Sequence, residues 1–402
     1  MKFFPCSPLS LLAWLGGAIS LHAAEWQLTV AAGDFDREGA LVTFIAPAEM
    51  RGPFLLHEAG GSSSPMQVDL DGRGCFIEAG LNRGARKTYT VAAARHLPNS
   101  VFTEKSGAVV KVSAQPGGGP IFHYQTEPGP VPAGTAEGFR HGAHLHPVFS
   151  PGGRIVTANH PPDHPHQRGI FMAWTKTDFE GRHPDFWNMG KDKGGFTGEV
   201  RFASLERVWS GPVRGGFVSR HRFIDHTSGA EKDVLAETWE VTAARLPAAF
   251  LIDFTSTQST AGEVPLKLPK YHYGGFGVRG AAAWDPVDRV TMLTSNGDDR
   301  KAGDSTKAKW VHLGGQLEGQ PAGIAVLIHP ENFRFPQGLR LNPKNPQLCV
   351  APSQDGDWEI TPGQPFVSRY RVIVADAAAD AVALERQWND YATPPVVELQ
   401  RR

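Results

Sequence analysis

One short segment concentrates the side chains that could do chemistry. Residues 160–169 read His-Pro-Pro-Asp-His-Pro-His-Gln-Arg-Gly and contain three histidines, one aspartate and one arginine. Three prolines fix their own φ angles and push the preceding residues towards extended conformations. We therefore expect an ordered loop that presents titratable side chains. Six of the sixteen histidines lie between residues 141 and 166, so the functional site is expected in this region.

These imidazoles are compatible with two kinds of chemistry. On a strand, residues two apart share a face, so His144 and His146 are expected to point the same way. His164 and His166 have the same spacing. Together with Asp163 they could hold a divalent metal ion, because imidazole and carboxylate are good ligands for first-row metals. Otherwise they hydrogen-bond a polar ligand or the loop backbone, and an imidazole pKa of about 6.5 suits proton transfer at neutral pH. No HExxH motif decides between the two.

Two arginines could recognise a ligand near this loop. Arg168 offers a planar fork of five donors, which suits a carboxylate or vicinal hydroxyls, or else forms an ion pair with Asp163 or Asp185. A second cluster, residues 270–279, reads Lys-Tyr-His-Tyr-Gly-Gly-Phe-Gly-Val-Arg. It is a poor phosphate loop because no Lys-Ser/Thr pair follows it. It either presents His272 and Arg279 to a cleft or forms a glycine-rich central strand.

Aromatic residues interleave with polar ones just after the loop. Trp174 and Trp187 lie close in sequence to Asp185 and Asn188. Aromatic rings beside carboxylates and amides are typical of sugar-binding clefts, where rings stack on C–H faces and polar groups bind hydroxyls. The alternative is that Trp174 and Phe186 belong to the hydrophobic core.

Composition and the N-terminus restrict the class of protein. The 402 residues carry 40 basic and 41 acidic side chains without a basic stripe, which argues against nucleic acid as a partner. Residues 1–24 combine Lys2, an apolar run and small residues, and predict a signal peptide that is too short to span a membrane. We expect a periplasmic or secreted protein. Cys75 and Cys349 would remain after cleavage, either as a disulfide or as separate buried thiols.

The elements that must position these residues are mainly strands. With 45 glycines and 32 prolines between short β-branched runs, the chain favours antiparallel strands. One helix is predicted from Asp376, as N-cap, to Tyr391. The segment Gln-Pro-Gly-Gly-Gly-Pro at 115–120 is expected to be a linker between a small immunoglobulin- or fibronectin-like β-sandwich at 25–114 and a large β domain at 121–402. The strands expected most clearly are 26–30, 40–45, 109–112, 250–255 and 367–374.

Five motifs resemble one family of bacterial proteins of unknown function, the PmoA family, also labelled methane oxygenase PmoA. They are HPVFSPGG (146–153), PDHPHQRGIF (162–171), GGFGVR (274–279), HPENFRFP (329–336) and PGQPFVSRYR (362–371). This sequence has Gln167 where a third loop histidine is common in the family. The order of strands and the His/Arg cleft also look similar to the galactose-mutarotase-like β-supersandwich, which typically binds or acts on carbohydrates. The resemblance thus implies an all-β fold: an antiparallel β-supersandwich after the small sandwich, with one C-terminal helix.

The sequence therefore predicts an exported protein that acts on a sugar or sugar derivative, as a lyase, an epimerase or a glycoside-cleaving enzyme. His164 and His166 would transfer protons or bind metal, while Arg168 and Arg279 would orient substrate or stabilise an oxyanion. Trp174 and Trp187 would form a stacking wall. Other expected substrate contacts are His146, Asp163, Asp185 and His272. If a divalent metal is present, its expected ligands are His144, His146, Asp163, His164 and His166. The alternatives are a non-catalytic glycan-binding or envelope-associated module and, third, a metal-dependent oxygenase.

Overall fold

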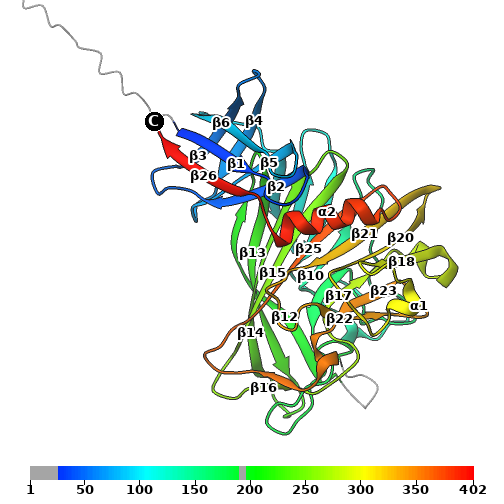
Figure 1. Cartoon of the computed structure of the whole chain (residues 1–402). Helices are drawn as coiled ribbons and strands as arrows, with labels where there is room; N and C mark the ends of the chain where they lie inside the picture. The colour runs from blue at the N-terminus through cyan, green and yellow to red at the C-terminus, as the bar shows by residue number, and fades with distance from the viewer. Residues whose placement is uncertain (1–25, 190–195) are drawn as a thin grey trace, which may run out of the picture.

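The computed structural model describes residues 26–189 and 196–402, and these form a mostly β protein (Figure 1). The strands pair antiparallel in three large sheets, which confirms the predicted all-β class. The predicted signal peptide lies outside the described residues. Among the described residues, no helix has the length and apolar character needed to cross a membrane.

The N-terminal strands form a seven-stranded sheet around a core of its own, centred on residues such as Leu28, Val42, Leu56 and Phe76. The last strand of the chain returns to this sheet and pairs with the first, as Figure 1 shows. In spatial order the strands are β2 (Arg37–Ile45), β5 (Arg73–Leu81), β4 (Ser63–Val68), β3 (Gly52–Glu58), β6 (Arg86–Ala93), β1 (Trp26–Ala31) and β26 (Val396–Arg401).

A nine-stranded sheet carries the predicted functional region. Its order is β19 (Lys307–Ala308), β22 (Gln337–Leu341), β23 (Gln347–Val350), β17 (Gly275–Arg279), β11 (Ile170–Ala173), β10 (His144–Val148), β9 (Pro120–Gln125), β8 (Val109–Ala114) and β7 (Val101–Ser106). The glycine-rich segment is thus a central strand, β17, between β11 and β23. Glycine is needed at residue 277, because a Cβ there would lie 2.6 Å from the Trp187 ring.

An eight-stranded sheet of long strands packs against the nine-stranded one. Its order is β12 (Gly198–Trp209), β13 (Arg214–Asp225), β14 (Lys232–Arg245), β15 (Ala249–Thr260), β25 (Phe366–Ala375), β21 (Gln320–Ile328), β20 (Trp310–Leu317) and β18 (Val290–Thr294). A two-stranded sheet joins β16 (Leu266–Leu268) to β24 (Trp358–Ile360). Short 3-10 turns occur at Glu137–Phe139, Ala282–Trp284, Val287–Arg289 and Pro352–Asp355.

Aromatic side chains from both large sheets meet in one continuous core. Tyr124 of β9 stacks on Phe217 of β13 with ring centroids 4.4 Å apart, and Phe276 of β17 stacks on Tyr370 of β25 at 4.3 Å. Such pairs add to the apolar area that the sheets bury. The two sheets therefore form a sandwich that holds β10, β11 and β17 rigidly in its centre.

The expected linker at 115–120 is instead a loop inside one sheet. Strands β7 and β8 pair with each other, and β8 pairs with β9 across this loop. The N-terminal sheet takes its last consecutive strand at β6 and is completed by β26. A glycine- and proline-rich stretch breaks regular structure in a hairpin as well as in a linker, so composition could not distinguish the two.

Helix α2 (Ala381–Ala392) joins the N-terminal sheet to the sandwich (Figure 1). It begins later than predicted because Asp380, not Asp376, accepts hydrogen bonds from the first-turn amides. The Asp376 carboxylate instead accepts a hydrogen bond from Arg154 at 2.8 Å. Helix α1 (Arg300–Gly303) is a single turn.

The two cysteines lie in different sheets and are both buried free thiols. Cys75 is on β5 and Cys349 on β23. Burial raises the pKa of each thiol to about 12, so both stay protonated and unreactive at neutral pH. Of the two possibilities for this pair, the structure supports separate buried thiols.

Candidate functional site

The proline-histidine segment is an ordered loop that leads into strand β11. Its ends meet at a bridge between Asn159 and Arg168. Inside it, the His164 amide donates to the Pro161 carbonyl at 3.1 Å, and the Gln167 amide donates to the His164 carbonyl at 2.9 Å. These consecutive turns close the loop on itself, which holds its side chains in place.

Arg279, at the end of β17, holds this loop through contacts with Gln167 and Asp163. Its side chain is fully buried, and Nη1 donates to Gln167 Oε1 at 2.7 Å. The Nη2 group forms an ion pair with Asp285 and lies 3.6 Å from Asp163 Oδ1. Burial lowers the pKa of Arg279, although the two carboxylates oppose that shift. Arg279 therefore positions the loop and is not itself available to a substrate.

A cavity of about 310 Å³ opens beside the loop, and we call it the histidine cavity. It brings together four of the predicted site residues: His164, His166, Trp187 and His272. The described residues that line it are His164, His166, Gln167, Trp187, Asn188, His272, Tyr273, Arg340, Asn342 and Gln347.

Asp163 and His164 form a pair at this cavity. His164 Nδ1 lies 2.8 Å from Asp163 Oδ2, and Asn345 Nδ2 donates to the same oxygen at 3.1 Å. Burial alone would raise the pKa of Asp163. The hydrogen bonds from His164 and Asn345 and the charge of Arg279 together lower it by more, so its pKa is below the usual value. A carboxylate only accepts, so Nδ1 carries the proton and Nε2 is left as the basic nitrogen.

His166 is a neutral imidazole in the same wall. Its ring lies 5.6 Å from that of His164. Burial lowers the pKa of His166 to about 3, with smaller contributions from His164 and Arg168. At neutral pH it can therefore donate and accept hydrogen bonds but carries no charge.

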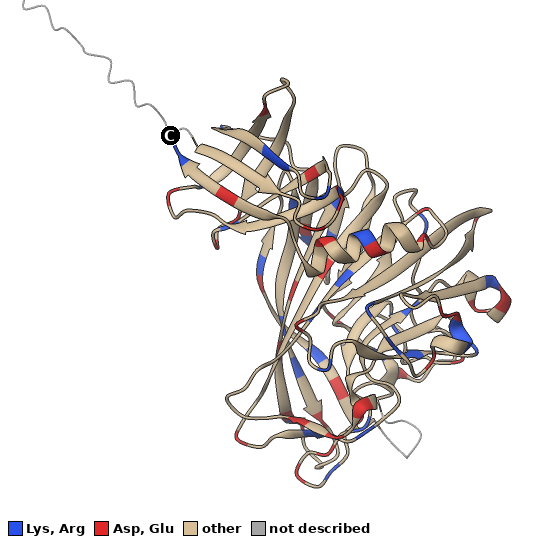
Figure 2. Cartoon of the chain, viewed as in Figure 1, with Lys and Arg blue, Asp and Glu red and all other residues tan. Residues whose placement is uncertain are grey.

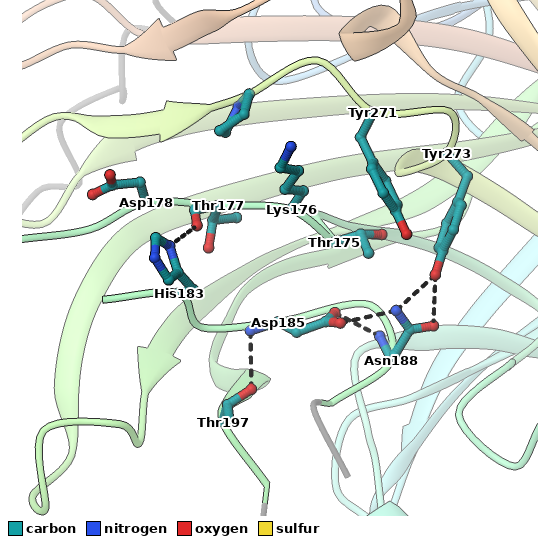
Figure 3. Close-up of a pocket in the computed structure, with 11 residues that line it drawn as sticks. Thr175, Lys176, Thr177, Asp178, His183, Asp185, Asn188, Thr197, Tyr271 and Tyr273 are labelled. Carbon is teal, nitrogen blue, oxygen red and sulfur yellow. Dashed lines mark hydrogen bonds between the residues drawn. The ribbon is translucent and has the colours of Figure 1, made fainter. Parts of the chain in front are cut away.

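A second cavity, of about 570 Å³, adjoins the first at Asn188 and Tyr273, which line both (Figure 3). We call it the tyrosine cavity. Figure 3 shows the hydroxyl ends of Tyr271 and Tyr273 pointing towards Thr175 and Asn188. Of the residues that the structure describes, those lining it are Thr175, Lys176, Thr177, Asp178, His183, Asp185, Asn188, Thr197, Pro269, Tyr271 and Tyr273.

Asp185 organises the segment between the two cavities. Its Oδ1 accepts hydrogen bonds from the amides of Trp187 at 3.0 Å and Asn188 at 2.8 Å. Its Oδ2 accepts one from Asn188 Nδ2 at 2.9 Å, and that amide nitrogen also donates to the Tyr273 hydroxyl at 2.9 Å. The side chains shared by the two cavities are thus held by a continuous hydrogen-bond chain.

Besides Arg279, the structure buries three of the predicted site residues: Trp174, Trp187 and Arg168. Trp174 and Trp187 are each 1% exposed, and Trp174 Nε1 donates to Gln258 at 2.8 Å, so the expected Trp174–Trp187 stacking wall is corrected: both rings belong to the core, and Tyr273 is the half-buried ring beside them. Arg168 is also 1% exposed and stacks on Phe171 at 4.9 Å. Within the described residues it has no ion pair with Asp163 or Asp185. Trp174 and Arg168 were placed at the cavity because each is adjacent in sequence to residues that do line it.

The upstream histidines are packed together rather than exposed to a ligand. His141 stacks on His160 at 4.0 Å, and His144 contacts His141 edge-on. His146 binds Thr157, and burial lowers its pKa to about 4. Of residues 26–189 and 196–402, no three His, Cys, Asp or Glu side chains form a group that could hold a metal ion. The expected ligand set His144, His146, Asp163, His164 and His166 is thus divided between this packed cluster and the loop.

Several cavity residues were not identified from the sequence. Tyr271 and Tyr273 flank His272 in a segment that was singled out, and their alternation with it was the available signal. Arg340, Asn342 and Gln347 gave no local signal. They reach the histidine cavity only because β22 and β23 pair with each other, and β23 with β17.

The fold and site define an all-β sandwich protein with two adjoining cavities, which are lined by polar and aromatic side chains from the segments next to β11 and β17. Residues 111–389 match the model of a family of unknown function, DUF6807, and the chain belongs to that family. A search of curated proteins returned no match.

Among solved structures, the chain is similar to three very different proteins. One is an α-galactosidase of family GH36, AgaB from Geobacillus stearothermophilus, with 12% identity and a TM-score of 0.31 over 71% of this chain and 41% of that one. Another is a galactose mutarotase related enzyme from Lactobacillus acidophilus, with 8% identity and a TM-score of 0.29 over 70% and 99%. A third is a TPR-domain protein from Parabacteroides distasonis, with 10% identity and a TM-score of 0.26 over 89% and 56%. The alignment covers about two fifths of the GH36 enzymes' length. At these scores the likenesses carry no argument about function, which must come from the site.

Proposed function

We propose that this protein binds a carbohydrate across the histidine and tyrosine cavities and acts on it with His164 as the proton-transferring group. One observation carries the proposal: the Asp163–His164 pair stands at a cavity whose neighbour is lined by tyrosine, threonine and carboxamide side chains.

The lining suits a ligand rich in hydroxyls. A sugar hydroxyl both donates and accepts, and the hydroxyls of Tyr271, Tyr273 and Thr175 do the same. The half-buried rings of Tyr271 and Tyr273, 4.9 Å apart, supply an apolar surface for the C–H faces of a sugar. The combined cavities leave room for more than one sugar unit, because a single unit would not fill both.

His164 has the arrangement of a general acid or base. With its Nδ1 hydrogen bonded to Asp163, Nε2 takes or returns a proton, and the carboxylate stabilises the imidazolium that forms. Lyase, epimerase and glycoside-cleaving reactions all begin with proton transfer at a sugar carbon or oxygen, so this group serves any of the three. His166, held neutral, would bind substrate by hydrogen bonds.

The test combines binding and turnover on a panel of oligosaccharides. We expect wild-type protein to bind and convert at least one, and His164→Gln to lose about 10²-fold or more in kcat while Kd changes little. His96→Gln, the same change at an exposed position, is the matched control. Binding without turnover by the wild type would make the protein a glycan-binding module, the alternative function. Absence of binding across the panel would contradict the proposal.

Two further expectations from the sequence belong to this proposal. The first 24 residues would export the protein to the periplasm or the medium, which N-terminal sequencing of the mature protein would test. The PmoA label, with its metal-dependent oxygenase, predicts a stoichiometric redox metal. Elemental analysis of active protein would test that prediction, and full activity in a metal-free preparation would rule the oxygenase out.

A further inference from the structure

Building on the proposed function, we infer that the histidine cavity is the subsite for a negatively charged sugar substituent, a carboxylate or a sulfate ester. The preferred substrate would then be an acidic oligosaccharide rather than a neutral one. The inference depends on the charges and unused hydrogen-bond donors of this one cavity.

Among the described residues, the lining of the histidine cavity contains no aspartate or glutamate. It has one guanidinium, three imidazoles and four carboxamide side chains, together with an indole and a phenol. The imidazoles and carboxamides offer N–H donors, although those of Asn188 are already used within the protein. Such a wall, with the positive charge of Arg340 held by Asp304 behind it, suits an anionic substituent.

Gln347 adds a carboxamide side chain to the same wall. The residue is 4% exposed, and its side chain lies beside the buried Cys349 thiol. Its position in the wall is therefore fixed by packing, so a charge placed on this side chain would act directly on a ligand in the cavity.

Arg340 brings the charge. Its Nη1 donates to Asp304 at 2.5 Å, which fixes the side chain across the cavity wall. Its Nη2 donates to no protein acceptor among the described residues, so this edge of the guanidinium is left for a ligand. An arginine held by one carboxylate can still bind a second anion through its other nitrogens.

The tyrosine cavity has the opposite character. Asp178 and Asp185 belong to its lining, and among the described lining residues only Lys176 contributes a permanent positive charge. The Thr175 hydroxyl is a buried polar group without a partner there, although the residue is 8% exposed. Neutral hydroxyls fit this cavity better than an acid. The two cavities would therefore orient an acidic oligosaccharide, with the charged substituent beside Arg340 and a neighbouring sugar unit beside Tyr271.

The first experiment compares matched ligands by isothermal titration calorimetry. An oligosaccharide from the uronate series would be compared with its carboxyl-reduced neutral counterpart and with a sulfated neutral counterpart. We expect the carboxylate or the sulfate form to bind at least tenfold more tightly than the neutral form. Which of the two does so identifies the source of the charge. Equal binding of all three overturns the inference but leaves the proposed function standing, whereas binding of none across a panel of backbones contradicts both.

The second experiment changes the charge of the cavity. Gln347→Glu keeps the size of the side chain and places a carboxylate in the wall, so the acidic ligand should lose at least tenfold in affinity while the neutral one loses little. Gln320→Glu, the same change at the exposed first residue of β21, should alter neither. If Gln347→Glu does not fold, Arg340→Gln provides the same comparison. Retention of the acid preference in a folded variant would overturn the inference.

Discussion

At the scale of single residues, burial lowers the pKa of several histidines in and around the loop, so these imidazoles are uncharged at neutral pH. Burial lowers the pKa of His146 to about 4 and of His166 to about 3, and it lowers those of His141 and His144 well below their usual value. Burial disfavours the charged form of an imidazole in such surroundings. His164 differs from these rings because it is half-exposed and hydrogen-bonded to Asp163.

The same buried histidines predict how stability depends on pH. In the unfolded chain each imidazole takes up a proton near pH 6.5, but in the folded protein His166 does so only near pH 3. Between these values the unfolded state binds more protons, so the free energy of unfolding falls as pH falls. Each such histidine contributes a slope of up to about 1.4 kcal/mol per pH unit.

His166→Gln should therefore reduce the slope of the unfolding free energy against pH, by up to about 1.4 kcal/mol per pH unit between pH 6 and 4. Urea unfolding at several pH values, followed by circular dichroism, measures the slope. His96→Gln, at an exposed position, is the control and should leave it unchanged. An unaltered slope in His166→Gln would mean that this imidazole is not held neutral by the fold.

At the scale of elements, the strands were easier to predict than their partners. Runs such as 250–255 and 367–374 lie within β15 and β25, because β-branched and aromatic residues suit a sheet that is covered on both faces. In β25 the side chains of Ser368, Tyr370, Val372 and Val374 on one face are buried, and Arg371 and Ile373 on the other face are buried as well, because the N-terminal sheet and α2 cover it. That second cover is a tertiary effect, absent from the local pattern.

The residues of the candidate site were likewise predictable where a local pattern marks them, and not where only strand pairing brings them together. The loop with His164 and His166 could be predicted, since prolines and histidines mark it within ten residues. Arg340 and Gln347 could not, because only sheet pairing brings β22 and β23 beside that loop. The sequence also could not show that Trp174 faces the core, since burial depends on the sheet opposite.

The ion pair between Arg37 and Asp390 is the contact that should hold α2 on the N-terminal sheet. Both side chains are 1% exposed, and Arg37 also donates to the carbonyls of Ala32 and Thr393. Arg37→Met leaves a buried carboxylate unpaired, so we expect a loss of about 3–5 kcal/mol in the free energy of unfolding. Thermal and urea unfolding measure it.

Two comparisons make that measurement specific. Adding Asp390→Leu to Arg37→Met should recover much of the loss, because the unpaired charge is removed. Arg86→Met breaks an exposed pair with Glu398 and should cost no more than about 1 kcal/mol. Similar losses from Arg37→Met and Arg86→Met would show that the buried pair has no special weight.

At the scale of the whole molecule, the first and last strands of the chain pair with each other. The charged side chains of the described residues are spread over the surface rather than gathered in one patch. Figure 2 shows lysine and arginine interspersed with aspartate and glutamate over the sheets and loops. The C-terminal strand completes the N-terminal sheet, and β7 to β9 carry the chain directly from that sheet into the sandwich. The residues of the two cavities all belong to the sandwich, so the N-terminal sheet supports the site only through the packed junction.

This arrangement predicts that removal of residues 394–402 separates the stability of the N-terminal sheet from that of the site. The deletion strips β26 from β1 along six register pairs and exposes the side chains that the half-buried Val397 and Leu399 cover. Their partial burial is worth about 2 kcal/mol, and the newly open edge of β1 adds an unpaired row of backbone groups. Hydrogen exchange should therefore speed up in β1 and β6 while β10, β11 and β17 keep their protection, and ligand affinity should be retained. Equal loss of protection in both regions, with loss of binding, would show instead that the sheet and the sandwich unfold as one cooperative unit.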